Sequence, residues 1–286
     1  MADEAKAKGN ATFSAGKFEE AIGYFVEAIA LSPDNHVLYS NHSAAYASLH
    51  KYEDALKDAK KTVELKSNWA KGYSHLGAAY VGLGQLDEAI GSYKQEALQE
   101  KEYGDAVYKK KEFESAVQHY SRAIELDDED ISYITNRAAV YLEMGKYEES
   151  IVDCDKAVEK GRLQHADYKM IVKALTRKGT AYTKMAKNSK DYEPAIEAFK
   201  KALTEHRNPD TLKKLNDDER AKKDLEHQEY YDPAIANEEK EKGSDFFKQG
   251  QYPEAVKYSD AIKRNPADAK AFSLQPNSYY HVGELY

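Results

Sequence analysis

The sequence predicts an all-α fold in which antiparallel helix pairs stack into an extended solenoid. One observation is a five-residue phrase, Lys-x-x-Gly followed by Asn, Asp or Ser, that occurs at Lys6–Asn10, Lys101–Asp105 and Lys240–Ser244. Another is the composition: 32% of the residues are charged and the mean hydropathy is -0.82, yet the chain has 23 tyrosines. This mixture is typical of amphipathic helices that bury thin cores and expose wet outer faces.

Each copy of the phrase opens the same longer pattern: an aromatic residue, a turn that ends in a second aromatic, and an alanine at a fixed offset. The three patterns are Phe13, Gly16-Lys17-Phe18 and Ala21; Tyr108, Lys111-Glu112-Phe113 and Ala116; and Phe247, Gly250-Gln251-Tyr252 and Ala255. Three starts predict three modules. We place the first module, with three repeats, at residues 1–98, the second, also with three, at 99–206, and a truncated third at 233–286.

Within the first module, small and aromatic residues recur with a period of about 34 residues. The blocks 2–35, 36–69 and 70–103 carry these residues at matching positions: Gly9, Ala21, Phe25 and Ala28; Tyr39, Ser43, Ala55 and Ala59; Tyr73, Gly77, Ala89 and Tyr93. Small residues suit the places where two helices cross closely, and aromatics fill the space to the next repeat. The pattern resembles the tetratricopeptide repeat (TPR) family.

The period breaks at two places. Gly77 and Gly104 are only 27 residues apart, seven fewer than the period, so the second helix of repeat three and the first of repeat four are predicted to form one helix over about 86–109. Ala138 and Gly179 are 41 residues apart, and the extra residues are expected within 161–170. A polar helix with its following linker, at 207–232, is predicted to cap the array. Pro276 falls inside an expected helix of the third module, which should therefore be incomplete.

Composition excludes several classes of function. A net charge of -8 argues against a nucleic-acid partner, and no stretch has the character of a signal peptide or membrane helix. The single Cys154 predicts a reducing compartment, hence the cytoplasm, and we expect it to be buried and inert. The nine histidines form no metal motif, so we expect neither an enzyme nor a cofactor. The acidic run Asp127–Asp130 reads as a solvated turn and helix N-cap.

The first helices of stacked repeats line the concave face, and here they carry cations and amides. Residues four apart share one helix face, so the first module should gather Lys6, Asn10, Asn41, Lys71 and His75 in one groove. The second should gather Lys101, Asp105, Asn136, Lys173 and Arg177. Converging cations and amides suit the carboxylates of a peptide terminus. The alternative, that these cations are merely solvated, is weakened because the pattern occurs twice.

The resemblance becomes narrower at four segments: Tyr39-Ser40-Asn41, Lys71–Ser74, Asn136–Tyr141 and Leu203–Lys214. These are similar to the stress-inducible co-chaperones that organise heat-shock chaperones. The resemblance implies a "carboxylate clamp" for C-terminal Glu-Glu-Val-Asp tails, of the 70-kDa chaperone in module one and the 90-kDa chaperone in module two. It also implies peptide contacts for Tyr108 and Glu143, and it makes Lys240 and Ser244 a vestigial clamp.

The chain departs from that family at several positions. His75 stands where the family has Arg, Asp105 and Ser244 stand for Asn, and Leu274 stands for a further Asn. The family's linker and small helical domain between the first two modules have no room here, so the chain reads as a shortened form. His75 predicts tighter binding by module one near pH 6 than near pH 8, and Asp105 predicts weaker binding by module two.

One other class of function fits the same pattern. A scaffolding repeat protein would bind internal helical segments of its partners and not their termini. A peptide with a free Glu-Glu-Val-Asp carboxylate should compete with the ligand only in the clamp interpretation, and its C-terminal amide should not compete in either.

Overall fold

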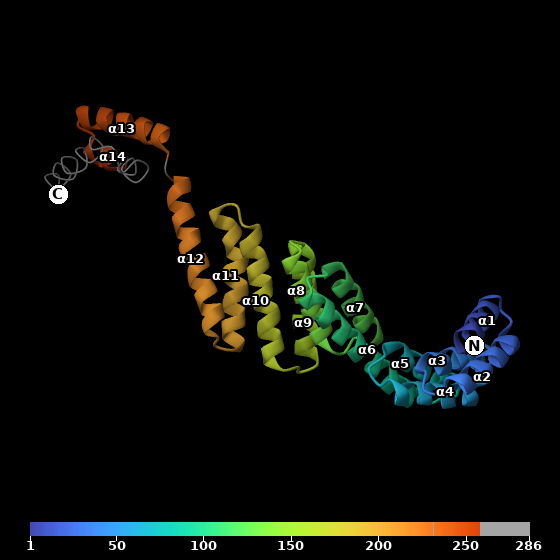
Figure 1. Ribbon diagram of the computed structural model, residues 1–286. Coiled ribbons are helices and arrows are strands. Elements are labelled where there is room, and N and C mark those ends of the chain that lie inside the picture. The colour runs from blue at the N-terminus through green and yellow to red at the C-terminus, as the bar shows by residue number, and fades with distance from the viewer. Residues whose placement is uncertain (231, 258–286) are drawn as a thin grey trace. The chain divides into compact units, whose positions relative to one another are not determined.

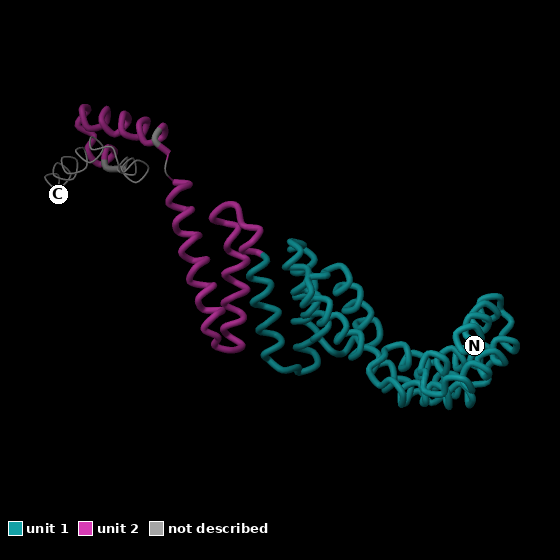
Figure 2. The backbone as a smooth tube through the Cα atoms, in the orientation of Figure 1, with its two compact units in different colours: residues 1–181 teal, residues 182–286 magenta. Residues whose placement is uncertain are grey.

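A computed structural model describes residues 1–230 and 232–257. The chain divides into two compact units, residues 1–181 and 182–286 (Figure 2). The described residues contain helices and no strand, which confirms the predicted all-α class (Figure 1). Pro276 and Leu274, on which part of the prediction for the third module depends, lie outside the described residues.

The first unit is built from consecutive helices, and through α9 each one packs against the next. They are α1 (Ala2–Ser14), α2 (Phe18–Leu31), α3 (His36–Ser48), α4 (Tyr52–Leu65), α5 (Ala70–Gly82), α6 (Leu86–Lys109), α7 (Phe113–Leu126), α8 (Ile131–Glu143), α9 (Tyr147–Leu163) and α10 (Tyr168–Met185). The unit boundary falls within α10. Additional contacts join α1 to α3 and α3 to α5. These contacts between alternate helices are those of a solenoid.

Small residues make the close helix crossings possible. Ala21, Ala55 and Ala116 have no exposed surface. A Cβ atom added to Gly9 would lie 2.6 Å from the Phe25 ring, and one added to Gly104 would lie 2.9 Å from the Tyr120 ring. The residues that defined the sequence repeat are therefore those that the packing requires to be small.

The turns within the helix pairs reproduce the repeat in the backbone. The residue with left-handed φ is Gly16, then His50, Gly84, Lys111 and Gly145 along the chain, with φ between 57° and 75°. The spacing is 34 residues except between Gly84 and Lys111, where it is 27. Two of these positions are not glycine, although a side chain in this region strains the backbone.

Helix α6 confirms the predicted single helix over about 86–109. It packs against α5 and against α7, and so acts as the second helix of one repeat and the first of the next. Tyr103 Oη donates to the Asn68 carbonyl oxygen at 2.7 Å, His119 Nδ1 lies 2.7 Å from Glu100 Oε2, and Arg122 Nη2 lies 3.2 Å from Glu96 Oε1. These contacts brace α6 on both sides.

Equivalent polar pairs connect the helices in both modules. His42 Nδ1 lies 2.7 Å from Asp58 Oδ2 between α3 and α4. At the matching positions of α8 and α9, Arg137 Nε lies 2.7 Å from Asp153 Oδ2. All four side chains are largely buried, and the hydrogen bonds from Arg137 to Asp153 offset part of the cost of removing that pair from water. The two modules are thus copies in their packing as well as in their surface pattern.

The other local predictions for the second module also agree with the structure. Asp130 is the N-cap of α8 and accepts a hydrogen bond from the Ser132 backbone N at 2.7 Å. Cys154 is buried, and burial raises the pKa of its thiol to about 12. The extra residues between repeats lengthen α9 and α10 around a short loop at 164–167.

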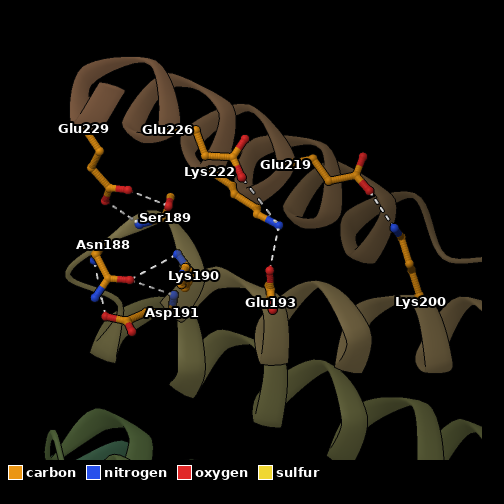
Figure 3. Close-up of polar contacts among 10 residues, drawn as sticks. All are labelled: Asn188, Ser189, Lys190, Asp191, Glu193, Lys200, Glu219, Lys222, Glu226 and Glu229. Carbon is orange, nitrogen blue, oxygen red and sulfur yellow. Dashed lines mark hydrogen bonds and ion pairs between the residues drawn. The ribbon is translucent and has the colours of Figure 1, made fainter. Parts of the chain in front are cut away.

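The second unit contains the predicted polar helix, α12 (Pro209–Tyr230), packed against α11 (Glu193–Glu205) and the short 3-10 helix η1 (Ser189–Tyr192). Glu229 accepts hydrogen bonds from Ser189 N at 2.8 Å and Ser189 Oγ at 2.7 Å (Figure 3). Lys222 Nζ lies 3.1 Å from Glu193 Oε1. Ala195, Phe199 and Leu215 form the apolar core between α11 and α12.

The third start of the pattern forms a helix pair of its own, α13 (Pro233–Lys248) and α14 (Tyr252–Lys257). Gly250 has a φ of 72°, and the Phe247 and Tyr252 rings lie 5.4 Å apart at the turn. In the first module, Phe13 and Phe18 make the same T-shaped contact at 5.3 Å. The sequence pattern therefore specifies the same turn in both places.

The left-handed conformation of Lys111, with a φ of 64°, generates a stability prediction. Lys111→Gly should raise the free energy of unfolding by about 0.5–1 kcal/mol, because glycine adopts this conformation without strain. Lys110→Gly is the matched control: it removes the same charge at a φ of -83° and should lower the free energy of unfolding. Urea unfolding of both variants measures the difference. Equal destabilisation by the two substitutions would contradict the assignment of strain to Lys111.

Candidate functional site

A pocket of about 490 Å³ opens on the concave side of the first module, between α1, α3 and α5. Its polar lining includes four of the residues predicted from the sequence, Asn10, Asn41, Lys71 and His75. The remaining lining residues are Phe13, Ser14, Phe25, Val37 and Ala44. Residues from α1, α3 and α5, which are the first helices of three successive repeats, thus meet at one site. Apolar side chains line the same pocket as the polar groups.

The amides and the lysine of this pocket are arranged to receive an anion. Asn41 Nδ2 donates to Asn10 Oδ1 at 2.9 Å. Because Asn10 uses its carbonyl oxygen in this bond, its own amide hydrogens remain available as donors. Lys71 is exposed, and among the described residues it makes neither a hydrogen bond nor an ion pair. An anion in the pocket would therefore meet one unpaired cation and oriented amides.

His75 behaves differently from the sequence-based expectation. Its side chain is half-buried, and its Nε2 atom is buried without a hydrogen-bond partner among the described residues. Burial, and then the nearby charge of Lys71, lower the pKa of His75 from 6.5 to about 4. The prediction of tighter binding near pH 6 presumes an imidazole with its ordinary pKa in the free groove, and the lowered pKa removes that premise. At neutral pH, Lys71 supplies the positive charge of the pocket.

Lys6 lies at the edge of this site. It stands one turn before Asn10 on α1, and its Nζ lies 2.7 Å from Asp3 Oδ1 in an exposed ion pair. Lys6 is not part of the pocket lining. Exposed ion pairs contribute little energy, so this contact leaves Lys6 able to turn toward a ligand.

In the second module, the predicted residues Lys101 and Asn136 converge on Asp105. Lys101 Nζ donates to Asp105 Oδ2 at 3.0 Å, and Asn136 Nδ2 donates to Asp105 Oδ1 at 3.4 Å. Tyr120 was not among the residues predicted for this site, and its Oη donates to Asp105 Oδ1 at 2.5 Å. The structure therefore confirms the predicted proximity of Lys101 and Asp105, and it adds the Tyr120 hydroxyl to the groups that contact Asp105.

The two remaining cations predicted for the second groove lie on α10. Arg177 Nη1 donates to the Thr135 carbonyl oxygen at 2.5 Å, and burial lowers the pKa of its guanidinium, which is half-buried. Lys173, one turn earlier, is exposed and has no hydrogen-bond or ion-pair partner among the described residues. Lys173 thus corresponds to Lys71 of the first module. Both are unpaired cations among the described residues, and each lies on the first helix of the third repeat in its module, α10 and α5 respectively.

Tyr108 and Glu143, predicted as peptide contacts, lie on α6 and α8. Tyr108 is half-buried and packs against the cluster of Ala116, Tyr120 and Val140, with its ring 6.0 Å from that of Phe113. Glu143 is exposed at the end of α8. Tyr108 occupies the position that Phe13 has in the first pocket, so its ring is placed to supply an apolar wall.

The predicted vestigial clamp lies on α13. Lys240 Nζ donates to Asn237 Oδ1 at 3.3 Å, and Ser244 Oγ donates to the Lys240 carbonyl oxygen at 2.8 Å. The described part of this module consists of one helix pair. The described part of this module therefore offers a single first helix, α13, where each of the other modules has three.

The structure adds Phe25, Val37 and Ala44 to the site, and sequence reasoning did not name them as ligand contacts. Phe25 was visible as a repeat residue, but its place in the pocket wall depends on the absence of a side chain at Gly9. In the described part of the chain, no set of three or more His, Cys, Asp or Glu side chains is placed to hold a metal ion. Nor does any helix described there have the length and apolarity to cross a membrane.

Stacked helix pairs, with a polar pocket in the first module and a cluster of polar side chains around Asp105 in the second, define a helical repeat protein. The model of the TPR repeat matches residues 104–145. Relatives similar to this chain include the Hsp70-Hsp90 organizing protein of Triticum aestivum, which is 44% identical over 100% of this chain and 76% of its own length. Hsp70-Hsp90 organizing protein 3 of Arabidopsis thaliana is 46% identical over 100% and 75%. The chain belongs to the Hsp70-Hsp90 organizing protein family.

A solved structure gives the same result for the fold. The TPR2AB-domain:pHSP90-complex of yeast Sti1 matches 65% of this chain and 70% of that chain at 40% identity, with a TM-score of 0.57. The alignment with the Triticum relative runs over 442 residues, whereas this chain has 286. The relative therefore contains stretches with no counterpart here, as expected for a shortened form.

The depressed pKa of His75 gives a pH prediction with a defined sign. The imidazole has a pKa of about 4 in the folded protein and an ordinary value of 6.5, so between these values the unfolded chain binds the extra proton. The stability that neutral His75 contributes is present above pH 6.5 and is lost as the pH falls toward 4. His75→Gln should flatten the pH dependence of unfolding in that window. An NMR titration of the parent protein that placed the His75 midpoint near 6.5 would contradict this.

Proposed function

We propose that this protein is a co-chaperone adaptor that binds the C-terminal Glu-Glu-Val-Asp tails of 70-kDa and 90-kDa heat-shock chaperones. Membership of the Hsp70-Hsp90 organizing protein family supports this, as does the similarity to a TPR structure in complex with a pHSP90 ligand. The observation that carries the proposal is the pocket of module one, where unpaired Lys71 lies beside Asn10 and Asn41.

In module one, the terminal carboxylates of the tail would be held by charge-assisted hydrogen bonds. Lys71 supplies the charge, Asn10 supplies amide donors oriented by Asn41, and His75 supplies a neutral ring nitrogen as a donor or acceptor. Phe13 and Val37 of the apolar wall suit the valine of the tail. Few peptide residues are held, so the affinity should be modest, about -8 kcal/mol or micromolar.

In module two, Lys173 and Arg177 would carry the corresponding role on α10. Lys173 is the exposed cation, and Arg177 is fixed by its bond to the Thr135 carbonyl oxygen. Tyr108 would supply the apolar wall, and exposed Glu143 would accept hydrogen bonds from the peptide. By resemblance to the family, module one would take the 70-kDa chaperone and module two the 90-kDa chaperone.

Helix α6 makes the spacing of the two grooves a fixed feature of the first unit. The first groove is built on α1, α3 and α5, and the second on the C-terminal half of α6, α8 and α10. Since α6 belongs to both modules, no flexible tether separates them. Simultaneous binding of two tails then depends on geometry and not on the effective concentration that a linker would provide.

The adaptor needs no cofactor in this proposal and acts by bringing chaperones together, without catalysing a reaction. We place it in the cytoplasm, where its single buried thiol would stay reduced. The competing proposal, a scaffold for internal helical segments, predicts a ligand without a terminal carboxylate. Titration calorimetry with a free-acid Glu-Glu-Val-Asp peptide and its C-terminal amide distinguishes the two. Equal affinity for both peptides would refute the clamp.

The two unpaired lysines give the sharpest mutational test. Lys71→Ala and Lys173→Ala should each weaken binding of the free-acid peptide by about 1.5–3 kcal/mol, the range for a hydrogen bond to a charged group. Each loss should be confined to its own module.

Exposed lysines outside the grooves provide matched controls. Lys57→Ala on α4 and Lys156→Ala on α9 remove the same charge and should leave the affinity within about twofold, because surface charges at a distance are screened. Calorimetry at constant ionic strength compares all four variants. If the groove variants and the controls behaved alike, Lys71 and Lys173 would not contact the ligand.

A further inference from the structure

The two grooves can be compared position by position. Up to Tyr46, each residue of the first module has a counterpart 95 residues further along the chain, the last being Tyr141. Lys6 corresponds to Lys101 and Asn41 to Asn136, without change of residue type. Among the lining residues that change are Phe13, Ser14 and Val37, which become Tyr108, Lys109 and Ser132. Two further changes lie side by side: Asn10 becomes Asp105, and Phe25 becomes Tyr120. Both changes occur at one place in the groove, where the ring of residue 25 or 120 packs against Gly9 or Gly104.

The two changes are joined by a hydrogen bond. Tyr120 Oη donates to Asp105 Oδ1 at 2.5 Å. Phe25 has no hydroxyl, and Asn10 accepts only from Asn41 among the described residues. The pair Asp105 and Tyr120 therefore replaces the pair Asn10 and Phe25 as a unit, in which the new hydroxyl orients the new carboxylate.

Asp105 is positioned like a bound anion. Its two oxygens accept hydrogen bonds from Lys101 at 3.0 Å, Tyr120 at 2.5 Å and Asn136 at 3.4 Å. Lys101 and Asn136 are two of the groups that would otherwise meet a ligand carboxylate. The Asp105 side chain keeps 36% of its surface exposed, so it lies at the surface of the groove and not beneath it.

We infer that Asp105, held by Tyr120, is a built-in carboxylate that occupies the anion-binding donors of module two and makes this groove less selective for a free C-terminal carboxylate than module one. The inference rests on the proposed function and extends it: Asp105 is a specificity-determining residue. A ligand at module two would be recognised mainly through its side chains and through Lys173, and less through its terminus.

The physical reason is the difference between an amide and a carboxylate. Asn10 can donate to an incoming carboxylate, whereas ionised Asp105 can only accept. Two carboxylates that share one lysine repel each other, and the ligand gains less from a cation that is already paired. Burial, together with the hydrogen bond to Asp105, raises the pKa of Tyr120, so the phenol keeps its proton and continues to hold Asp105 in place.

The test compares a free-acid Glu-Glu-Val-Asp peptide with its C-terminal amide, by calorimetry on the full chain. Lys71→Ala weakens module one so that module two dominates the titration, and Lys173→Ala does the reverse. The measured quantity is the ratio of the acid affinity to the amide affinity at each module. We expect this ratio to be about tenfold larger at module one, which corresponds to about 1.4 kcal/mol.

Reciprocal exchanges then assign the difference to the Asp105–Tyr120 pair. Asp105→Asn with Tyr120→Phe should raise the ratio at module two about tenfold, and Asn10→Asp with Phe25→Tyr should lower it at module one by a similar factor. Asp105→Asn alone is nearly isosteric and should give most of the increase. Tyr120→Phe alone keeps the carboxylate and should leave the ratio at module two below that of module one. Thermal unfolding of every variant verifies that the fold is retained.

The outcomes separate the inference from the proposed function. If module one prefers the acid but the ratio at module two equals that of module one, or stays unchanged or falls in Asp105→Asn, the inference is overturned while the proposed function stands. If module one shows no preference for the acid, the proposed function itself fails. A rise in the ratio at module two together with a fall at module one supports the inference.

Discussion

The structure depends on a single shared helix. Helix α6 packs against α5 and also against α7, so one segment completes the third repeat and begins the fourth. The repeat is seven residues shorter at this point, which is about two turns of helix. Helix α6 therefore runs from one repeat into the next without an intervening turn. The two polar grooves are consequently parts of one compact unit. Tyr103, His119 and Arg122 brace this helix through contacts on both of its sides.

Sequence reasoning predicted the helix pairs well, because the repeat is written in residues that packing constrains. Gly9 and Gly104 leave no room for a side chain, and the left-handed turn residues keep the same spacing. It also predicted the contact of Lys101 with Asp105, since residues four apart share a helix face. These predictions required only local spacing and the repeat period.

Properties that depend on burial could not be predicted in this way. The position of His75 follows from the repeat, but its pKa depends on how far the neighbouring side chains exclude water. Tyr120 was not predicted to belong to the site, and only the structure shows that its hydroxyl reaches Asp105. The same repeat position therefore carries different chemistry in the two modules, and the difference arises from pairs of residues that change together.

We propose that two unequal peptide grooves lie on one compact helical unit, with the chemistry of the terminal carboxylate concentrated in the first. A crystal structure of the full chain with a free-acid Glu-Glu-Val-Asp peptide tests this most directly. The account predicts that the terminal carboxylate in module one lies within hydrogen-bonding distance of Lys71 Nζ and Asn10 Nδ2. A peptide bound along the grooves with its terminus in solvent, away from Lys71 and Asn10, would contradict it.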